Sequence, residues 1–317
     1  MNILLVKTSS MGDVINNLPV ASDILGQFPD ARIDWVVEET FSDIPRLHPG
    51  VRNVLPIAIR RWRKGFWNHD VRQEMKAFRN QLQSTAYDFV IDSQGLVKSA
   101  LVTWLAKGIR CGFDRRSAWE PIATYFYDRK FPVDPGLHAV VRYRQLAAQA
   151  LGYTVPEGID YGIRTPDIAL PWLPSVPYGV LLHGTSRPEK LWPEQRWLEL
   201  GQYFHQQGIL SVLPWGNASE KQRSEALASQ IPEAVVSPAL RLNEAATMLG
   251  RAKITIGVDT GLAHLSAALQ KPTIAIFCGS NPAHNGLYAS TPVRNLGNEG
   301  APPAVDEVIT AFNELTS

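Results

Sequence analysis

The order of apolar runs along the chain constrains its fold more than any other feature of the sequence. Short apolar runs alternate with segments whose apolar residues recur at helical spacing, and both halves of the 317 residues repeat this order. Strands that alternate with helices predict βαβ units and parallel sheets. The predicted strands are 3–6, 33–37, 53–56, 89–92, 179–183, 210–213, 254–258 and the run TIAIFCG. The predicted helices are 14–27, 70–83, 99–107, 192–207, 219–230, one beginning near 261 and a last one over 305–315.

A proline-rich segment separates the two series. Residues 154–178 contain five prolines, which remove backbone donors and disfavour helix, so this segment is predicted to be a linker. We therefore expect an N-terminal α/β domain over 1–160 and a second over 161–317. Ligands of parallel sheets bind beyond the carboxyl ends of the strands, and two such sheets facing each other would form a central cleft.

Composition excludes several classes of protein. No apolar run approaches the ~18 residues of a membrane span, and no signal-peptide pattern opens the chain. The two cysteines, Cys111 and Cys278, are too far apart to suggest a disulfide framework or a zinc site. A net charge of +1 argues against nucleic acid as a partner. We expect a cytoplasmic protein.

The stretch KTSSMGD follows the first strand and contains the first candidate for catalysis. Gly12 permits close backbone approach, and Asp13 stands at the start of a helix. An acid there is commonly a helix cap, worth ~0.5–2 kcal/mol, and on Asp13 alone this interpretation is favoured. The alternative is a general base at a cleft. The dinucleotide fingerprint G-x-G-x-x-G is absent.

Three further stretches each follow a strand in the second half. GVDTGLAHLSAAL places Asp259, Thr260, Gly261 and His264 at a helix start, which suits a pyrophosphate or is simply a cap with a core histidine. LLHGTSRPEKLWP carries Thr185, Ser186 and Lys190, which are phosphate ligands or a solvated loop, without forming a Walker A motif. LPWGNASEKQ places Glu220 where a ribose or base could bind.

The stretch IRRWRKGFW is basic and aromatic. Arginines grip phosphate or carboxylate, and the aromatic residues suit a membrane surface or an apolar, anionic acceptor. The basic residues are Arg60, Arg61, Arg63 and Lys64. The plain alternative is a solvated surface.

Together these stretches resemble glycosyltransferase family 9, the ADP-heptose:lipopolysaccharide heptosyltransferases. The resemblance rests on VKTSSMGDV, DWVVEE, LPIAIRRWRK, DSQGLVKSA, LPWG and VDTGLAHLSAAL, which span residues 3 to about 280. KTSSMGD and RRWRK make it closer to the enzymes that add the first heptose than to those that add a later one. Those later-step enzymes are the nearest alternative, followed by a sugar-nucleotide epimerase and a non-enzymatic binding protein.

The resemblance implies a GT-B fold with two Rossmann-like lobes and an inverting transfer of heptose from ADP-heptose to Kdo of Kdo-lipid A. It implies no metal and no other cofactor, a peripheral position on the cytoplasmic face of the inner membrane, and a monomer. Asp13 would be the base, and Lys190 would offset charge on the leaving ADP. The remaining implied donor contacts are Thr185, Ser186, Glu220, Asp259, Thr260, Gly261 and His264, and the implied acceptor contacts are Arg60, Arg61, Arg63, Lys64 and Lys98.

One position departs from the family pattern. Where the family often has an arginine before the Glu-Pro pair of the loop after residue 110, this chain has Trp119. Arg115 and Arg116 lie just upstream and could supply the charge. The departure affects the expected acceptor contacts of this loop and leaves the donor site unaffected.

Overall fold

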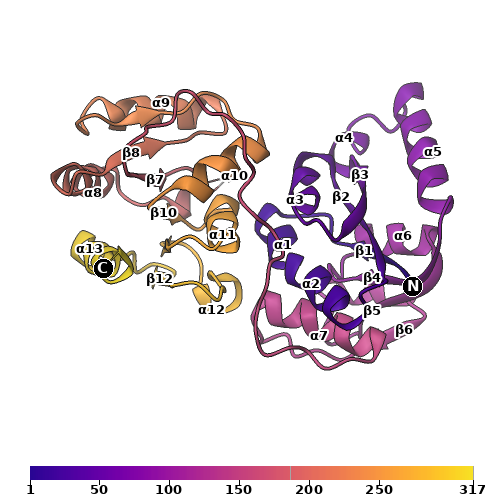
Figure 1. Cartoon of the computed structure of the whole chain (residues 1–317). Coiled ribbons are helices and arrows are strands. Elements are labelled where there is room, and N and C mark those ends of the chain that lie inside the picture. The colour runs from indigo at the N-terminus through magenta and orange to yellow at the C-terminus, as the bar shows by residue number, and fades with distance from the viewer. Residues whose placement is uncertain (186, 317) are drawn as a thin grey trace. The chain divides into compact units, whose positions relative to one another are not determined.

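The computed structural model describes residues 1–185 and 187–316, and its backbone divides into two units, Met1–Gly162 and Ile163–Ser317. The division falls in the proline-rich segment, which contains no helix or strand before Tyr178. Each unit holds a six-stranded parallel sheet with helices on its faces (Figure 1). The predicted α/β class with two Rossmann-like lobes is confirmed.

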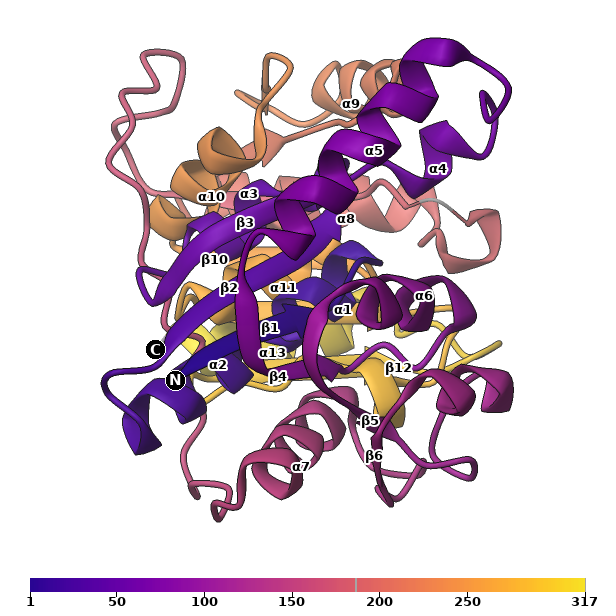
Figure 2. The same ribbon diagram turned by 90° about the vertical axis from the view of Figure 1, so that its right-hand side faces the viewer.

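The sheet of the first unit has the strand order β3-β2-β1-β4-β5-β6 (Figure 2). Its strands are β1 (Asn2–Val6), β2 (Arg32–Glu38), β3 (Val51–Ile57), β4 (Ala86–Asp92), β5 (Lys107–Phe113) and β6 (Arg129–Phe131). The chain runs outward from β1 to β3 and then returns to β4 on the other side of β1. Ligands of such sheets bind where the order reverses, here at the carboxyl ends of β1 and β4.

Helices cover both faces of this sheet (Figures 1 and 2). One face carries α1 (Met11–Asn16), α2 (Leu18–Gln27), α3 (Asp43–Arg46) and α7 (Ala139–Leu151). The other carries α5 (His69–Gln83) and α6 (Val97–Leu105), and Phe78 and Leu82 of α5 join the apolar core over β1 and β4. Shorter elements are α4 (Ile59–Trp62), η1 (Glu39–Phe41) and η2 (Pro121–Phe126).

The single helix predicted over 14–27 is wrong, because the structure has two helices there. α1 ends at Asn16, and α2 begins at Leu18. Pro19 has no N–H to donate to the carbonyl of Ile15, so a continuous helix would lose a hydrogen bond at this point. The helix predicted over 99–107 also begins and ends two residues too late, since Lys107 already belongs to β5.

The sheet of the second unit has the order β12-β11-β10-β7-β8-β9. Its strands are β7 (Tyr178–Leu182), β8 (Leu210–Leu213), β9 (Val235–Val236), β10 (Ile254–Val258), β11 (Thr273–Phe277) and β12 (Val293–Gly297). The order reverses between β7 and β10, so the carboxyl ends of these two strands mark the expected ligand position of this unit.

The helices of the second unit again cover both faces. They are α8 (Glu194–Gln206), α9 (Ala218–Ala228), α10 (Leu242–Arg251), α11 (Gly261–Ala268), α12 (Pro282–Asn285) and α13 (Val305–Thr316), with η3 (Pro188–Lys190). Val308 and Phe312 of α13 are buried in the core of the second unit, where the Phe312 ring lies 5.1 Å from that of Phe204. In the described part of the chain, no helix is both long and apolar enough to cross a bilayer.

Candidate active site

Asp13 lies in the first turn of α1, at the carboxyl end of β1. Its Oδ2 accepts hydrogen bonds from the Ser10 N–H, at 3.1 Å, and from the Ser10 hydroxyl, at 3.0 Å. The cap interpretation is therefore correct for this oxygen. The side chain nevertheless remains 35% exposed, so the same carboxylate is both anchored to the backbone and accessible.

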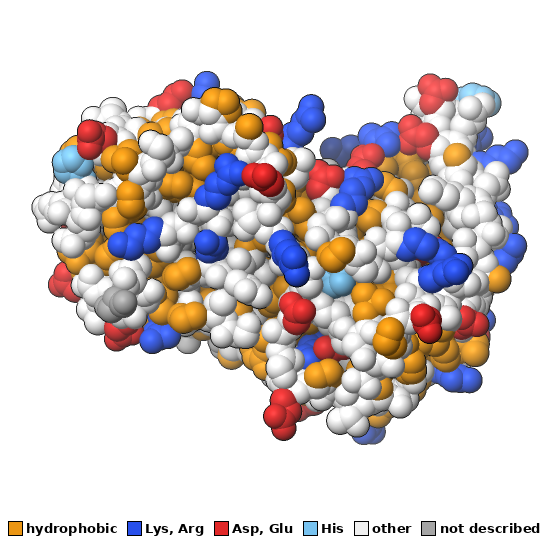
Figure 3. Space-filling model, viewed as in Figure 1, with side chains coloured by type: hydrophobic (Ala, Val, Ile, Leu, Met, Phe, Trp, Pro, Cys, Tyr) orange, Lys and Arg blue, Asp and Glu red, His pale blue; other side chains and the backbone are white. Residues whose placement is uncertain are grey.

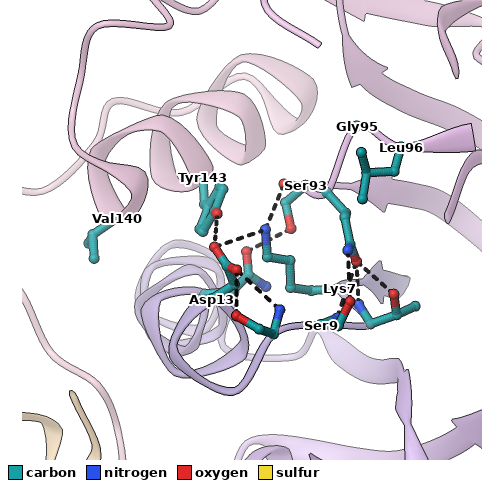
Figure 4. Close-up of polar contacts among 12 residues, drawn as sticks. Lys7, Ser9, Asp13, Ser93, Gly95, Leu96, Val140 and Tyr143 are labelled. Carbon is teal, nitrogen blue, oxygen red and sulfur yellow. Dashed lines mark hydrogen bonds and ion pairs between the residues drawn. The ribbon is translucent and has the colours of Figure 1, made fainter. Parts of the chain in front are cut away.

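The other oxygen of Asp13 faces two residues that the sequence analysis did not include (Figure 4). The Tyr143 hydroxyl, from α7, donates a hydrogen bond to Oδ1 at 2.8 Å. The Lys7 ammonium lies 3.9 Å from Oδ1 and 3.7 Å from the centre of the Tyr143 ring. Lys7 directly follows β1 and is almost fully buried.

These neighbours determine the pKa of Asp13. Burial raises this pKa, but the positive charge of Lys7 and the hydrogen bonds from Tyr143 and Ser10 outweigh burial, so the pKa lies below its ordinary value. In the free protein these neighbours therefore favour the ionised carboxylate, which is the form that can accept a proton.

The segment before α1 is held by the stretch DSQG, which begins at Asp92, the last residue of β4. The Gln94 Oε1 accepts hydrogen bonds from the Thr8 N–H and hydroxyl, both at 2.7 Å, and from the Ser9 N–H at 3.3 Å. Lys98, one of the predicted acceptor contacts, donates from its ammonium to the Ser9 hydroxyl at 2.8 Å. The structure thus brings Lys98 to the same turn as Asp13, and burial lowers the pKa of Lys98.

The basic stretch forms α4 and the loop after it, and its four cations are exposed. Arg61 is paired with both Glu39 and Glu74, at 3.1 and 2.8 Å. Basic and acidic side chains accordingly lie side by side where Figure 1 draws α4 (Figure 3). The Arg60 guanidinium lies over the ring of Phe41 instead. Arg63 and Lys64 take no part in the ion pairs that the structure describes.

The aromatic residues of this stretch differ from each other. Trp62 is a core residue, since its ring packs against Phe78 and its indole N–H donates to Glu74 at 2.8 Å. Phe66 and Trp67 are exposed, Trp67 by 85%. Only the latter two are therefore accessible to an apolar partner.

Trp119, which stands where the family often has an arginine, is exposed to solvent. Its ring lies 5.0 Å from the guanidinium carbon of Arg142, which also donates a hydrogen bond to the Ser117 carbonyl at 2.6 Å. Arg115 and Arg116, the predicted substitutes for the missing arginine, are both exposed.

The second unit gathers polar side chains at the carboxyl ends of β10 and β11. The Lys190 ammonium lies 2.5 Å from Asp259 Oδ2, and the Ser280 hydroxyl donates to the same oxygen at 2.7 Å. A Cβ at Gly279 would meet the Glu189 carbonyl at 2.6 Å, so a glycine there lets η3 bring Lys190 close to the sheet. Ser280 was not foreseen.

The start of α11 differs from a simple capped helix. Thr260 occupies the N-cap position but its hydroxyl makes no cap hydrogen bond. Of the two interpretations offered for this stretch, the cap is therefore not provided by Thr260, because its hydroxyl does not bond the first N–H groups of α11. Free N–H groups and the helix dipole favour an anion at such an end. His264, one turn further on, is buried.

The remaining predicted donor contacts lie beside β7 and β8. The Glu220 Oε2 accepts a hydrogen bond from the Gly216 N–H at 2.7 Å, and a Cβ at Gly184 would meet the Glu220 carboxyl carbon at 2.7 Å. Glu220 therefore lies between the ends of the two strands, close to Gly184, the residue before Thr185. Ser186 lies outside the described residues.

Residues 75–311 match the sequence model of glycosyltransferase family 9 (heptosyltransferase), and the chain belongs to this family. It is thus a glycosyltransferase with the GT-B fold. It is 46% identical over 301 residues to lipopolysaccharide heptosyltransferase 1 of Pseudomonas aeruginosa. The aligned region covers 94% of this chain and 84% of that protein. Two solved structures of E. coli heptosyltransferase WaaC cover 99% of both chains. The structure with ADP has a TM-score of 0.92 at 42% identity, and the structure with ADP-2-deoxy-2-fluoro heptose has a TM-score of 0.87 at 41% identity.

Proposed function

We propose that the chain transfers L-glycero-D-manno-heptose from ADP-heptose to a Kdo hydroxyl of Kdo-lipid A, the first heptose of the lipopolysaccharide inner core. The observation that carries the proposal is the likeness, over nearly the whole chain, to lipopolysaccharide heptosyltransferase 1. The accessible carboxylate of Asp13 and the cationic Lys190 are consistent with this chemistry. Each stands where the strand order of its sheet reverses.

In the proposed reaction a single displacement inverts the anomeric carbon. The acceptor oxygen attacks that carbon while its proton passes to Asp13, and the bond from the anomeric carbon to the ADP oxygen breaks with its electron pair going to the β-phosphate. Because the attack and the departure occur on opposite sides, the product has the inverted configuration.

The donor groups of the second unit suit the departing ADP. Lys190 and the start of α11, which the Thr260 hydroxyl does not cap, would supply positive charge to the diphosphate as it gains negative charge. Glu220, between β7 and β8, would accept a hydrogen bond from the ribose. Since these groups supply the required positive charge, we propose that transfer proceeds without a metal ion.

The proposed function predicts ADP release from ADP-heptose only when Kdo-lipid A lacking heptose is present, with a product one heptose heavier. Coupled ADP detection and mass spectrometry of the product measure both. EDTA should leave the rate unchanged, because Lys190 offsets the leaving charge. Activity only on an acceptor that already carries a heptose would mean that the enzyme adds a later heptose of the core. ADP-heptose turnover without acceptor would favour an epimerase or hydrolase.

The acceptor contacts can be tested at α4. Arg60→Glu should raise the acceptor KM about tenfold and leave the ADP-heptose KM unchanged, because an exposed cation is replaced by a charge that repels an anionic acceptor. Steady-state kinetics in both substrates measure this. Arg61→Glu is a less specific change, since Arg61 already neutralises Glu39 and Glu74. An unchanged acceptor KM in Arg60→Glu would make this segment an ordinary solvated surface.

We further propose that the N-terminal unit contacts the membrane in which the acceptor is anchored. Exposed apolar residues of α6 and the adjoining η2 support this, since tryptophan and tyrosine favour the bilayer interface. They are Leu101, Trp104, Ile122 and Tyr125, with Trp104 55% and Tyr125 76% exposed.

Replacing both Trp104 and Tyr125 by serine should reduce co-sedimentation with anionic vesicles, because interfacial anchors are lost. Val176→Ser, which alters an exposed apolar residue of the second unit, is the matched control and should bind as the unaltered protein does. Equal vesicle binding by all three proteins would refute this contact.

A further inference from the structure

We propose that Lys7 and Tyr143 are positioning residues that keep Asp13 ionised and leave one lone pair of its Oδ1 directed at the acceptor hydroxyl. This inference rests on the proposed function, because it concerns the base of that reaction. It adds two residues from distant parts of the chain, one directly after β1 and one in α7, to the residues that we propose act on the acceptor.

The count of hydrogen bonds at Asp13 supports the proposal. An ionised carboxylate offers about four lone-pair sites. Ser10 occupies two of them, on Oδ2, with its N–H and hydroxyl. Tyr143 occupies one on Oδ1, and the Lys7 ammonium, at 3.9 Å, is too distant to take the fourth by a hydrogen bond. One site on Oδ1 therefore remains for the proton of the acceptor.

Lys7 is held in place by its surroundings rather than by Asp13 alone. Its ammonium donates a hydrogen bond to the Ser93 carbonyl at 3.3 Å. The ammonium also lies over the Tyr143 ring, and the attraction between a cation and an aromatic face stabilises this position. The ammonium is buried, so its charge is poorly screened and acts strongly on Asp13. Tyr143 thus contacts both members of the pair, Lys7 by its ring and Asp13 by its hydroxyl (Figure 4).

Besides Asp13, three charged residues act on the Lys7 ammonium, namely Asp92 of β4, Arg142 of α7 and Lys98 of α6. Asp13 and Asp92 favour the charged form of Lys7, whereas Arg142 and Lys98 oppose it. Burial dominates and lowers the pKa of Lys7 to about 8, so Lys7 is still mostly protonated at pH 7. An ammonium that is expensive to bury yet kept next to a carboxylate is expected where its charge is needed for function.

Lys7→Met is the main test. Without the ammonium, burial is no longer offset by an opposite charge, so the pKa of Asp13 should rise by about 1–3 units. Asp13 must be ionised to act as a base, so the acidic limb of kcat/KM should move to higher pH by the same amount. The movement of the limb is the decisive readout, because removing one member of an ion pair can by itself lower the melting temperature. A role of Lys7 in the fold alone predicts a lower melting temperature with an unmoved limb.

Tyr143→Phe and Lys98→Met complete the set. Tyr143→Phe keeps the ring under Lys7 and removes only the hydrogen bond to Oδ1, so it should shift the acidic limb in the same direction by less. Lys98→Met removes a neighbouring ammonium that contacts Ser9 and should raise the acceptor KM with little movement of the limb. Acidic limbs that coincide in the unaltered protein and in Lys7→Met and Tyr143→Phe would overturn the proposal, as would an equal shift in Lys98→Met. Failure of the proposed function is distinct, since the unaltered protein would then transfer no heptose.

Discussion

Asp13→Asn is expected to lower kcat by about 10³-fold, because asparagine has nearly the same shape but cannot accept the proton of the acceptor hydroxyl at neutral pH. The dissociation constant of ADP-heptose should stay nearly the same, since all the proposed donor contacts belong to the other unit. Single-turnover kinetics with Kdo-lipid A and calorimetric titration of the donor measure the two quantities separately.

Asp70→Asn is the matched control for this change. Asp70 is also an acid in the first turn of a helix, α5, and it is exposed. Its replacement should leave kcat unchanged. If Asp13→Asn kept more than about a tenth of the original kcat, Asp13 would be a cap and not the base, because general bases contribute ~10²–10⁴-fold.

The strands at the centre of each sheet could be predicted from the sequence because they are short, mainly apolar runs. β1 and β10 are buried at nearly every position, and apart from Asn2, Thr255 and Gly257 their residues are apolar. β5 and β6 could not be predicted in this way. They contain lysine, arginine and glycine and approach the edge of the sheet, where one side of the ladder is less covered.

The positions of the candidate site residues follow from the same strands, since a parallel sheet brings all its carboxyl ends to one edge. Asp13, Thr185 and Asp259 were therefore identifiable from local motifs. Tyr143 was not, because it lies 130 residues from Asp13 in the middle of an amphipathic helix. Lys7 had only a weak signal, a lysine directly after an apolar strand, and its burial became apparent only with the packing of α7.

The state of each site residue was also beyond sequence reasoning. Trp62 has the pattern of a surface aromatic between arginines, yet its indole N–H pairs with Glu74 and its ring fills the core. Arg61 belongs to the same basic run as Arg60, but two acids already neutralise it. Residues of the same type within one run therefore have different surroundings, because neighbouring elements supply ion-pair and hydrogen-bond partners to some of them and not to others.

Lys190→Ala is expected to lower kcat by about 10²-fold and to raise the ADP-heptose KM about tenfold, because the cation that we propose offsets the charge of the leaving diphosphate is lost. Among the residues that the structure describes, the change also leaves Asp259, 13% exposed, with the Ser280 hydroxyl as its partner, so a carboxylate without a paired cation would remain at the proposed donor site. Steady-state kinetics with varied ADP-heptose measure both parameters. Lys253→Ala alters an exposed lysine at the opposite end of β10 and should change neither.

The double variant Lys190→Ala/Asp259→Asn separates the two effects of losing Lys190. Removing the carboxylate should recover much of the donor KM, since the repulsion disappears, but kcat should stay low because no ammonium faces the leaving group. Recovery of both parameters would mean that Lys190 serves only to neutralise Asp259. A raised KM with unchanged kcat in Lys190→Ala would limit Lys190 to ground-state binding, because a group that stabilises the departing ADP must affect kcat.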